Sequence, residues 1–245
     1  MNRVLGEDMS EIIVISGAGS GIGAACAVRF ARAGARVVLL GRRIDALQQV
    51  AAQCGAVALP MACDVTDLAQ VTHVLTSVQQ QFGRIDVLVS AAGTNLPERR
   101  VDQLTPASWQ MMIDTNLNGA FFLITQALPL LRIAQGVIVA IGSTSVPRPS
   151  SLGGASYNAA KSGLTAFVRT LAQEEAGHGV RATVLHPGEV DTPLIDKRPA
   201  PVSAERRAAM LHADDVAQVV QFVASLPARA TIPELVLTPS SNPFV

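Results

Sequence analysis

Short runs of β-branched residues alternate with longer amphipathic stretches along the chain, and this alternation restricts the possible folds more than any other feature. The runs that fit strands are 12–16, 36–40, 57–63, 87–90, 137–141, 181–185 and 235–237. The stretches with helical spacing are 21–33, 46–54, 67–82, 105–132, 156–176 and 214–225. Continuous apolar strands separated by helices are typical of a parallel sheet covered on both faces. The sequence therefore predicts an α/β fold with one doubly wound parallel sheet of about seven strands.

Composition and charge exclude several classes of protein. With 49% hydrophobic and 16% charged residues, the 245 residues are expected to form one domain, 1–245, around a large core. Nineteen basic residues balance nineteen acidic ones and lie scattered, which argues against binding of nucleic acid. Residues 1–10 include Glu7 and Asp8 and no apolar leader, and no run approaches the ~18 apolar residues of a membrane span. We therefore expect a cytoplasmic protein without membrane contact.

The cysteines and histidines give no sign of a metal site. The three cysteines have no metal-ligand spacing, so we expect them to be buried, reduced thiols: Cys26, Cys54 and Cys63. Three of the histidines form no cluster with carboxylates at ligand spacing: His73, His178 and His212. We therefore predict no catalytic metal. His186 precedes a proline at a strand end, and we interpret it as a structural residue rather than an acid-base group.

The first predicted strand runs directly into a glycine-rich turn, Ser16-Gly17-Ala18-Gly19-Ser20-Gly21-Ile22-Gly23, and then into an Ala-rich helix. Glycines permit a tight turn and a close approach of the backbone to a ligand, and the N–H groups at a helix start attract phosphate. Two glycine spacings fit, Gly19-x-Gly21-x-x-Ala24 and Gly17-x-x-x-Gly21-x-Gly23. Both indicate a dinucleotide-binding Rossmann fold.

The end of the second predicted strand bears on the choice between NADP and NAD. It reads Leu40-Gly41-Arg42-Arg43, with glycine where NAD-binding chains usually carry a carboxylate for the ribose 2′-hydroxyl. A guanidinium binds a 2′-phosphate by charge-assisted bonds, so Arg42 and Arg43 favour NADP(H) over NAD(H). In the alternative interpretation, the two arginines only solvate the start of a helix, with Asp45 near enough to pair with one of them.

Tyr157 and Lys161 are spaced four residues apart in a predicted helix, about fourteen residues after the Ser-rich strand end Ile141-Gly142-Ser143-Thr144-Ser145. That spacing stacks both side chains on one face, with Cβ atoms roughly 5–6 Å apart. Lowering a phenol pKa from ~10 to about 7 requires about 4 kcal/mol. One cation at ~4 Å supplies about that much at an effective dielectric of ~20. The pair thus indicates a tyrosine acid-base catalyst, although a surface Tyr-Lys pair has the same pattern.

In this order, these motifs resemble the classical short-chain dehydrogenase/reductase (SDR) family over nearly the whole chain. The turn resembles TGxxxGIG, with Ser16 for the threonine, and Asp64-Val65 is similar to the family's adenine-contacting pair. Three further segments resemble family motifs: Ser90-Ala91-Ala92-Gly93 (NNAG), Asp114-Thr115-Asn116-Leu117 (the asparagine helix) and Pro187-Gly188-Glu189-Val190-Asp191-Thr192 (PGxVxT). The first of these segments lacks both asparagines of its motif. The resemblance implies nucleotide contacts from the glycine turn, Ala91, Ala92 and Gly93. It also implies nicotinamide contacts from Pro187, Gly188, Val190 and Thr192.

The resemblance also implies a catalytic tetrad of Asn116, Ser143, Tyr157 and Lys161. In that family, the tyrosine transfers a proton to or from the substrate oxygen and the serine hydrogen-bonds the same oxygen. The lysine lowers the phenol pKa and holds the nicotinamide ribose, so both it and the tyrosine also contact the cofactor. The asparagine exposes a main-chain carbonyl to a water that links the lysine to solvent. The usual serine–tyrosine separation of thirteen would select Thr144, whereas the strand-end pattern selects Ser143, which we favour.

The expected function is an NADP(H)-dependent carbonyl reductase or alcohol dehydrogenase acting on a small molecule. Residues 191–212 are expected to form a substrate lid, because a structureless segment of that length is uncommon within a domain. The lid cations, Lys197, Arg198, Arg206 and Arg207, are expected to lie on a solvated helix face, with recognition of an anionic substrate as the alternative. The resemblance and symmetry favour a homodimer or homotetramer. The alternatives are an NAD-dependent enzyme, a redox-sensing protein that holds NADP without turnover, and an isomerase, dehydratase or epimerase.

Overall fold

The computed structural model describes residues 10–242. The expectation of no leader segment rests on residues 1–10, which lie outside the described part except for Ser10.

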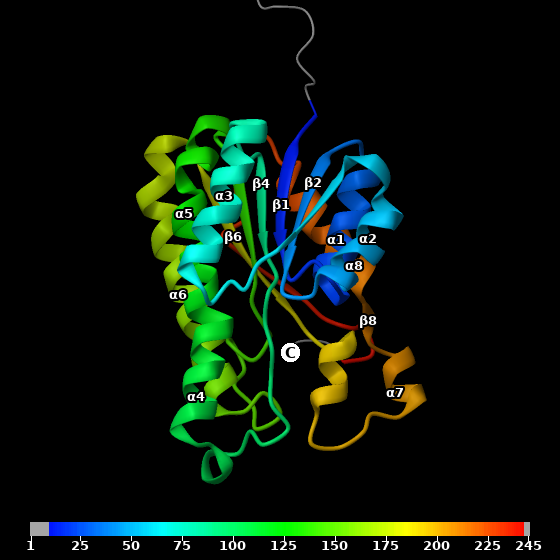
Figure 1. Cartoon of the computed structure of the whole chain (residues 1–245). Helices are drawn as coiled ribbons and strands as arrows, with labels where there is room; N and C mark the ends of the chain where they lie inside the picture. The colour runs from blue at the N-terminus through cyan, green and yellow to red at the C-terminus, as the bar shows by residue number, and fades with distance from the viewer. Residues whose placement is uncertain (1–9, 243–245) are drawn as a thin grey trace, which may run out of the picture.

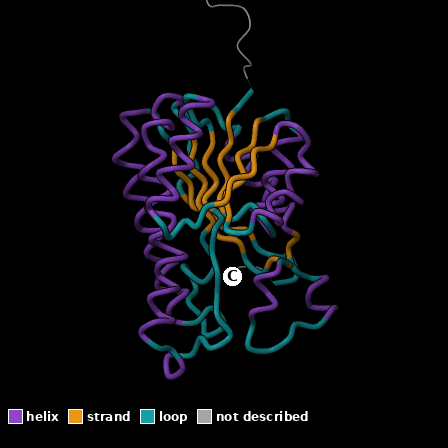
Figure 2. The backbone as a smooth tube through the Cα atoms, viewed as in Figure 1, coloured by secondary structure: helices purple, strands orange, loops and turns teal. Residues whose placement is uncertain are grey.

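Seven parallel strands form the central sheet, in the order β3-β2-β1-β4-β5-β6-β9 (Figure 2). They are β1 (Ile12–Ser16), β2 (Arg36–Gly41), β3 (Ala58–Ala62), β4 (Val87–Ser90), β5 (Val137–Ile141), β6 (Arg181–Pro187) and β9 (Glu234–Leu237). The predicted doubly wound parallel sheet of about seven strands is confirmed. Three predicted strands agree to the residue, because their apolar runs end abruptly at polar or glycine residues: β1, β4 and β5.

Helices cover both faces of the sheet (Figure 1). One face is packed by α3 (Leu68–Phe82), α5 (Gly119–Ala134) and α6 (Ala155–Glu175), and the other by α1 (Gly21–Arg32), α2 (Ile44–Cys54) and α8 (Ala213–Ala224). Successive strand residues point to opposite faces, so Val14 joins the first hydrophobic cluster, whereas Ile13 and Ile15 join the second. Burial on both faces explains why the strands have continuous apolar runs rather than alternating ones.

The predicted helix 105–132 is interrupted by a π turn. Thr105 caps α4 (Pro106–Ile113) by accepting a hydrogen bond from the Ser108 N–H. A π-helical turn, Asp114–Asn118, then leads into α5, and the Gly119 N–H bonds to the Asp114 carbonyl. Periodicity does not reveal the turn, because apolar residues continue through it. By length and composition, the stretch Pro106–Ala134 could cross a membrane, a helix that our inspection of the sequence missed; 39% of its most apolar window is buried.

The expected lid, 191–212, contains regular structure that was not predicted. Strands β7 (Val190–Asp191) and β8 (Leu211–His212) pair as a second, small sheet. Between them lie a 3-10 helix, Pro193–Lys197, and α7 (Ala204–Ala208). Elements of two to five residues are too short to produce a periodic pattern, which is why the sequence reads as irregular there. Three further 3-10 turns connect larger elements: Gly55–Val57, Val101–Gln103 and Ala176–His178.

The strand order reverses between β1 and β4, and this reversal positions the site. Chains leaving β1 and β4 turn toward opposite faces, which opens a crevice at the carboxyl ends of the strands. The Ser16 hydroxyl, at the end of β1, accepts hydrogen bonds from the Ala91 and Ala92 N–H groups, each at 3.2 Å. This hydroxyl fixes the loop after β4 beside the glycine turn, although that loop lacks the two asparagines of the family motif.

Candidate active site

Two neighbouring cavities lie at the carboxyl edge of the sheet, and most of the predicted site residues line one or the other. A cavity of about 330 Å³, the catalytic cavity, has all four predicted tetrad residues in its wall. A second cavity, of about 820 Å³, is lined by predicted nucleotide contacts, including Gly17, Arg42, Asp64, Val65 and Ala92. Gly93 and Thr94 belong to both walls. The predicted cofactor and catalytic residues are therefore brought together along one edge.

The glycine turn is too tight for side chains at two of its positions. Gly17 has φ +67°, and a Cβ there would lie 2.8 Å from the Ala92 nitrogen. A Cβ on Gly23 would lie 2.4 Å from the Gly17 carbonyl oxygen. Ser20 begins α1 without a side-chain cap bond, so its side chain does not satisfy the first N–H groups of the helix. Exposed backbone donors at a helix start are suited to a pyrophosphate group.

The two arginines after β2 differ in position. Arg42 lines the second cavity together with Gly41, whereas Arg43 is the N-cap residue of α2 and lies outside both cavity walls. Neither arginine forms an ion pair with Asp45 or with another carboxylate of residues 10–242. Asp64 is held in place by Thr66, whose N–H and hydroxyl donate to Asp64 Oδ1 at 3.0 and 2.8 Å. Arg42 is thus available to a phosphate at the point where the sequence predicts one.

Ser143, rather than Thr144, contacts the tyrosine. The Ser143 side chain lowers the pKa of the Tyr157 phenol, whereas the Thr144 N–H donates to the Pro187 carbonyl at 3.1 Å. Ser143 Oγ accepts from the Ser145 N–H at 3.1 Å and lies 2.9 Å from Ser145 Oγ. With its acceptor side engaged by Ser145, the Ser143 hydroxyl is directed to donate toward the phenol and the cavity.

The pKa of Tyr157 is shifted in the direction opposite to our expectation. Burial raises the phenol pKa, while the Ser143 hydrogen bond and the charge of Arg99 act to lower it. Lys161 is not among the groups that shift the phenol pKa. Its Nζ lies 5.8 Å from the centroid of the Tyr157 ring and donates to the Ile141 carbonyl instead. The cation that acts on the phenol is therefore Arg99, which the sequence analysis did not select.

Lys161 is buried at the base of the catalytic cavity. Its Nζ donates to the Ile141 carbonyl at 2.7 Å, and only 4% of the residue is exposed. Burial lowers the pKa of Lys161 to about 8. Nζ would lie 3.5 Å from a Cβ placed on Gly93, so the glycine leaves the ammonium accessible from that side.

Asn116 lies in the π turn, with its side chain fully engaged. Its amide donates to the Met112 carbonyl at 2.9 Å and accepts from the Thr94 N–H at 3.0 Å. The amide thus joins the π turn to the loop after β4. The π turn places Asn116 in the wall of the catalytic cavity together with Lys161.

The predicted nicotinamide segment lines the same cavity through Pro187, Gly188, Val190 and Thr192. The Thr192 methyl would lie 3.2 Å from a Cβ placed on Gly21. The start of the lid therefore lies directly against the glycine turn. Of the turn residues 16–23, Ile22 lines this cavity.

His186 packs against the loop after β5 that carries Ser143. Its fully buried ring contacts the Ser143 main chain, with Nδ1 3.1 Å from the nitrogen and 2.9 Å from the oxygen. Nε2 lies 3.2 Å from Glu234 Oε1 without alignment for a hydrogen bond. Burial lowers the pKa of His186, and the Glu234 charge opposes this effect. The structural interpretation of His186 is consistent with these contacts, but its partner comes from β9, far away in sequence.

The cysteines agree only in part with the expectation of buried thiols. Cys26 and Cys63 are buried, and burial raises their pKa values to about 12 and about 11. Cys54, the last residue of α2, is half-buried, because the helix ends at the surface there. All three are free thiols.

The lid cations do not share one solvated helix face. Arg206 and Arg207 lie on α7 and form exposed ion pairs. Lys197 instead donates through Nζ to Thr94 Oγ1 at 2.7 Å, and Arg198 lines the catalytic cavity. The expectation was wrong for Lys197 and Arg198 because, at the end of the 3-10 helix, Lys197 reaches Thr94 in the loop after β4 and Arg198 reaches the cavity wall.

Comparison with known proteins places these observations in a family. The family model described as short chain dehydrogenase matches residues 11–202. Serine 3-dehydrogenase from Agrobacterium fabrum is 33% identical over 241 residues, covering 96% of each chain.

Two solved structures extend the likeness to the fold. The closed form of serine dehydrogenase complexed with NADP+ has a TM-score of 0.88 and 30% identity, covering 95% of this chain and 96% of that one. A 3-ketoacyl-(acyl-carrier-protein) reductase from Brucella melitensis, complexed with NADH, has a TM-score of 0.86 and 27% identity, covering 94% and 97%.

Proposed function

The chain belongs to the short-chain dehydrogenase family and is an oxidoreductase of that family, and we propose that it interconverts a small carbonyl compound and its alcohol with NADP(H). The single observation that best supports this proposal is the position of Ser143, Tyr157 and Lys161 in one cavity beside the glycine turn. In the proposal, residues 1–245 form one nucleotide-binding domain, with residues 191–212 as its substrate lid.

The proposed chemistry assigns a role to each side chain. When bound, the nicotinamide cofactor supplies or takes up the hydride. Tyr157 donates a proton to the carbonyl oxygen in reduction and accepts it in oxidation. Ser143 donates a hydrogen bond to the same oxygen and stabilises its developing negative charge. Lys161 holds the nicotinamide ribose, and Asn116 belongs to the proton path behind it.

The preference for NADP(H) is part of the proposal. It is supported by Arg42 in the wall of the second cavity, by Gly41 in place of a carboxylate, and by the absence of an ion pair between Arg42 and any carboxylate of residues 10–242. A guanidinium that keeps its donors open can bind a 2′-phosphate. The NADP+ complex of serine dehydrogenase is consistent with this preference, whereas the NADH complex of the reductase keeps the NAD-dependent alternative open. Phosphate contacts are proposed for the glycine turn and an adenine contact for Asp64 and Val65.

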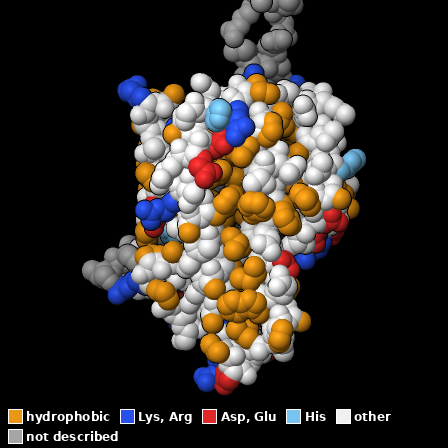
Figure 3. All heavy atoms as spheres, turned by 90° about the vertical axis from the view of Figure 1, so that its left-hand side faces the viewer, with side chains coloured by type: hydrophobic (Ala, Val, Ile, Leu, Met, Phe, Trp, Pro, Cys, Tyr) orange, Lys and Arg blue, Asp and Glu red, His pale blue; other side chains and the backbone are white. Residues whose placement is uncertain are grey.

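A homodimer or homotetramer is also proposed. Apolar side chains gather over the α4, α5 and α6 side of the molecule (Figure 3). Large residues on the α4–α5 stretch are exposed there, including Trp109, Met111 and Phe121, at 38% to 44%. An apolar helix surface of this kind is explained by contact with a second copy of the chain, which light scattering of the purified protein would measure. A cytoplasmic location is proposed with it.

The test of the enzymatic proposal is NADPH oxidation against a panel of carbonyl compounds, with Tyr157→Phe as the comparison. Removing the phenolic proton donor should lower kcat about 10²–10⁴-fold while the NADPH dissociation constant stays within about twofold. Full activity of Tyr157→Phe on every accepted substrate would exclude the mechanism. NADPH binding without turnover on any carbonyl or alcohol would support the alternative of a redox-sensing protein.

A further inference from the structure

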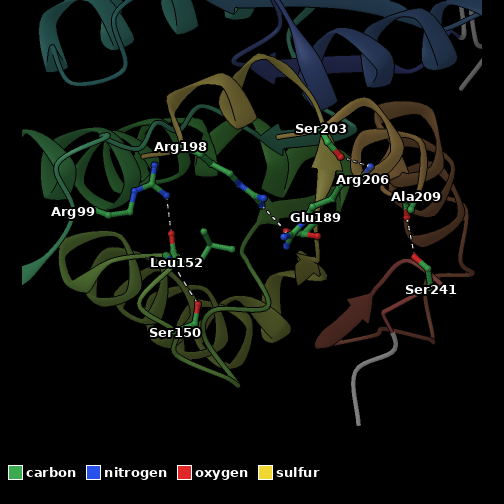
Figure 4. A network of polar contacts seen from close by, with 10 residues as sticks. Arg99, Ser150, Leu152, Glu189, Arg198, Ser203, Arg206, Ala209 and Ser241 are labelled. Atoms are coloured by element: carbon green, nitrogen blue, oxygen red, sulfur yellow. Dashed lines mark hydrogen bonds and ion pairs between the residues drawn. The ribbon is translucent and has the colours of Figure 1, made fainter. Parts of the chain in front are cut away.

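Three arginines line the catalytic cavity, and no part of the proposed hydride chemistry requires them. Arg148 is exposed, whereas Arg99 and Arg198 are largely buried. Arg99 comes from the loop after β4, and Arg198 from the lid, just after its 3-10 helix. Arg99 is 5% exposed, and the Arg198 side chain is 12% exposed. Their guanidinium groups approach the cavity from two separate segments (Figure 4). Besides Lys161, the cavity wall thus has two largely buried cations, of which Arg99 acts on the Tyr157 phenol.

Arg99 is buried without a counter-ion. Its Nε, Nη1 and Nη2 donate to three main-chain carbonyls, those of Leu96, Leu152 and Lys197, at 2.6 to 2.7 Å. No carboxylate among residues 10–242 pairs with it. A guanidinium has five N–H donors, so two remain after these bonds. A buried charge that is hydrogen-bonded but not neutralised is costly, and an anion entering the cavity would remove that cost.

Arg198 shares its carboxylate partner, Glu189, with a second arginine and is therefore available to a ligand. Glu189 Oε1 accepts from Arg198 at 2.7 Å and from Arg206 at 2.8 Å (Figure 4). Burial alone would raise the pKa of Glu189, but the bonds from Arg206 and Arg198 lower it, so this carboxyl is ionised. Two cations share one carboxylate, and Arg206 approaches Glu189 from an exposed position outside the cavity wall. Arg206 can therefore keep Glu189 neutralised while Arg198 turns to a second anion.

We propose that the substrate carries a carboxylate, which Arg198 and Arg99 bind while the reacting oxygen lies at Tyr157. This inference rests on the proposed oxidoreductase function and names its substrate class: short-chain hydroxy acids and the corresponding oxo acids. The planar fork of a guanidinium matches a carboxylate in shape as well as in charge. Short chains are required because Tyr157, Arg99 and Arg198 line a cavity of about 330 Å³, part of which the nicotinamide takes up.

The experiment compares carboxylates with their neutral amides. The 2-, 3- and 4-hydroxybutanoates and their primary amides are titrated calorimetrically into the protein saturated with NADP+, and then tested as substrates. At least one carboxylate should bind about tenfold or more tightly than its amide. Arg198→Gln should weaken the binding of that carboxylate about tenfold and change amide binding less than about twofold. Arg100→Gln removes an exposed arginine that pairs with Asp102 and lies outside both cavity walls. It is the matched control and should leave both affinities near those of the wild type.

The outcomes separate the substrate class from the underlying function. If no carboxylate binds more tightly than its amide, or if Arg100→Gln weakens carboxylate binding as much as Arg198→Gln, the carboxylate site is refuted. In that case, Tyr157-dependent reduction of neutral carbonyls would leave the oxidoreductase proposal intact. Conversely, carboxylate-selective binding that depends on Arg198, with turnover that ignores Tyr157→Phe, would refute the proposed mechanism but not the anion site.

Discussion

The nucleotide side and the substrate side of the crevice are constructed in different ways. On the nucleotide side, the glycine turn after β1 leaves no room for a Cβ at Gly17 or Gly23, so its shape depends on its own backbone. On the substrate side, three loops are joined by long side chains that donate to main-chain carbonyls, as Arg99 does to Leu152 and Lys197.

This difference has a consequence for how each side responds to substitution. A site made of backbone depends on the absence of side chains, so adding a single methyl group should be enough to disrupt it. A site made by bridging side chains depends on particular donors, so removing one donor should loosen several loops together. The cofactor side should therefore be sensitive to added volume and the substrate side to lost hydrogen bonds.

The largest effect is expected for Gly23→Ala. A Cβ there would lie 2.4 Å from the Gly17 carbonyl oxygen, so the turn must shift and its phosphate-facing N–H groups move with it. NADPH affinity, measured by fluorescence titration, should fall about a thousandfold, or about 4 kcal/mol. Gly177→Ala is the control, because a Cβ at Gly177 meets nothing within 4 Å. Equal NADPH affinity in the two variants would mean that the turn accepts added volume after all.

The next largest effect is expected when the Ser143 hydroxyl is removed. Ser143→Ala should lower kcat about 10²–10³-fold, because a donor to the developing oxyanion is removed. Thr144→Val should change kcat less than about threefold, since the Thr144 contact with Pro187 is made by the main chain. Steady-state kinetics with any accepted carbonyl measures both variants. The reverse order would identify Thr144 as the catalytic hydroxyl.

Lys161 gives a pH-dependent test. Its pKa in the folded protein is about 8, below the ordinary 10.5, so between these values the unfolded chain binds a proton that the folded chain does not. The unfolding free energy should therefore rise with pH across this window, by about 3 kcal/mol in total, and the gain is lost as the pH falls through 8. Urea unfolding of the wild type and of Lys161→Met at several pH values measures the rise. Parallel pH profiles for the two proteins would contradict the assignment.

A smaller effect is expected when Arg99 is replaced. Arg99→Met leaves three carbonyls without their donor and should cost about 2 kcal/mol of unfolding free energy. Hydrogen exchange should accelerate in residues 145–154 and 193–198 but not in the glycine turn. Arg100→Met is the adjacent control, because Arg100 is exposed and pairs with Asp102 at the surface; it should cost less than about 0.5 kcal/mol. Uniform acceleration throughout the protein would mean that the two sides are not independent.

The smallest effect concerns cofactor choice. Arg42→Ala should weaken NADPH binding about tenfold and leave NADH binding unchanged, because one charge-assisted contact with the 2′-phosphate is lost. Arg43→Ala should change neither affinity by more than about twofold, since Arg43 lies outside both cavity walls. Dissociation constants for both cofactors measure the outcome. Wild-type affinity that is equal or tighter for NADH would exclude the proposed NADP preference.

The contrast between the two sides also explains how far the sequence could be interpreted. The strands β1, β4 and β5 were predicted to the residue because burial on both faces requires uninterrupted apolar runs. The glycine turn was recognisable because backbone geometry alone selects glycine. Tyr157 and Lys161 were recognisable because one helix carries both.

What the sequence did not reveal depends on contacts between distant segments. Glu234 reaches His186 only because β9 pairs with β6, with Val184 opposite Glu234 in the register. Arg99 acts on Tyr157 from a loop whose path is set by Leu152 and Lys197 rather than by its own pattern. The π turn at Asp114–Asn118 has no periodic signature. In each case the decisive partner is distant in sequence or the element is too short to show a pattern.

Gly154, at the start of α6, ties two positions in the chain to one another. It has φ +83°, and a Cβ there would lie 2.6 Å from the Arg99 Cβ and 2.8 Å from the Arg99 carbonyl oxygen. Every residue except glycine has both of these atoms, so position 154 requires a glycine whichever side chain stands at position 99. Among homologous chains, the glycine should therefore persist while position 99 varies with the charge of the substrate pocket.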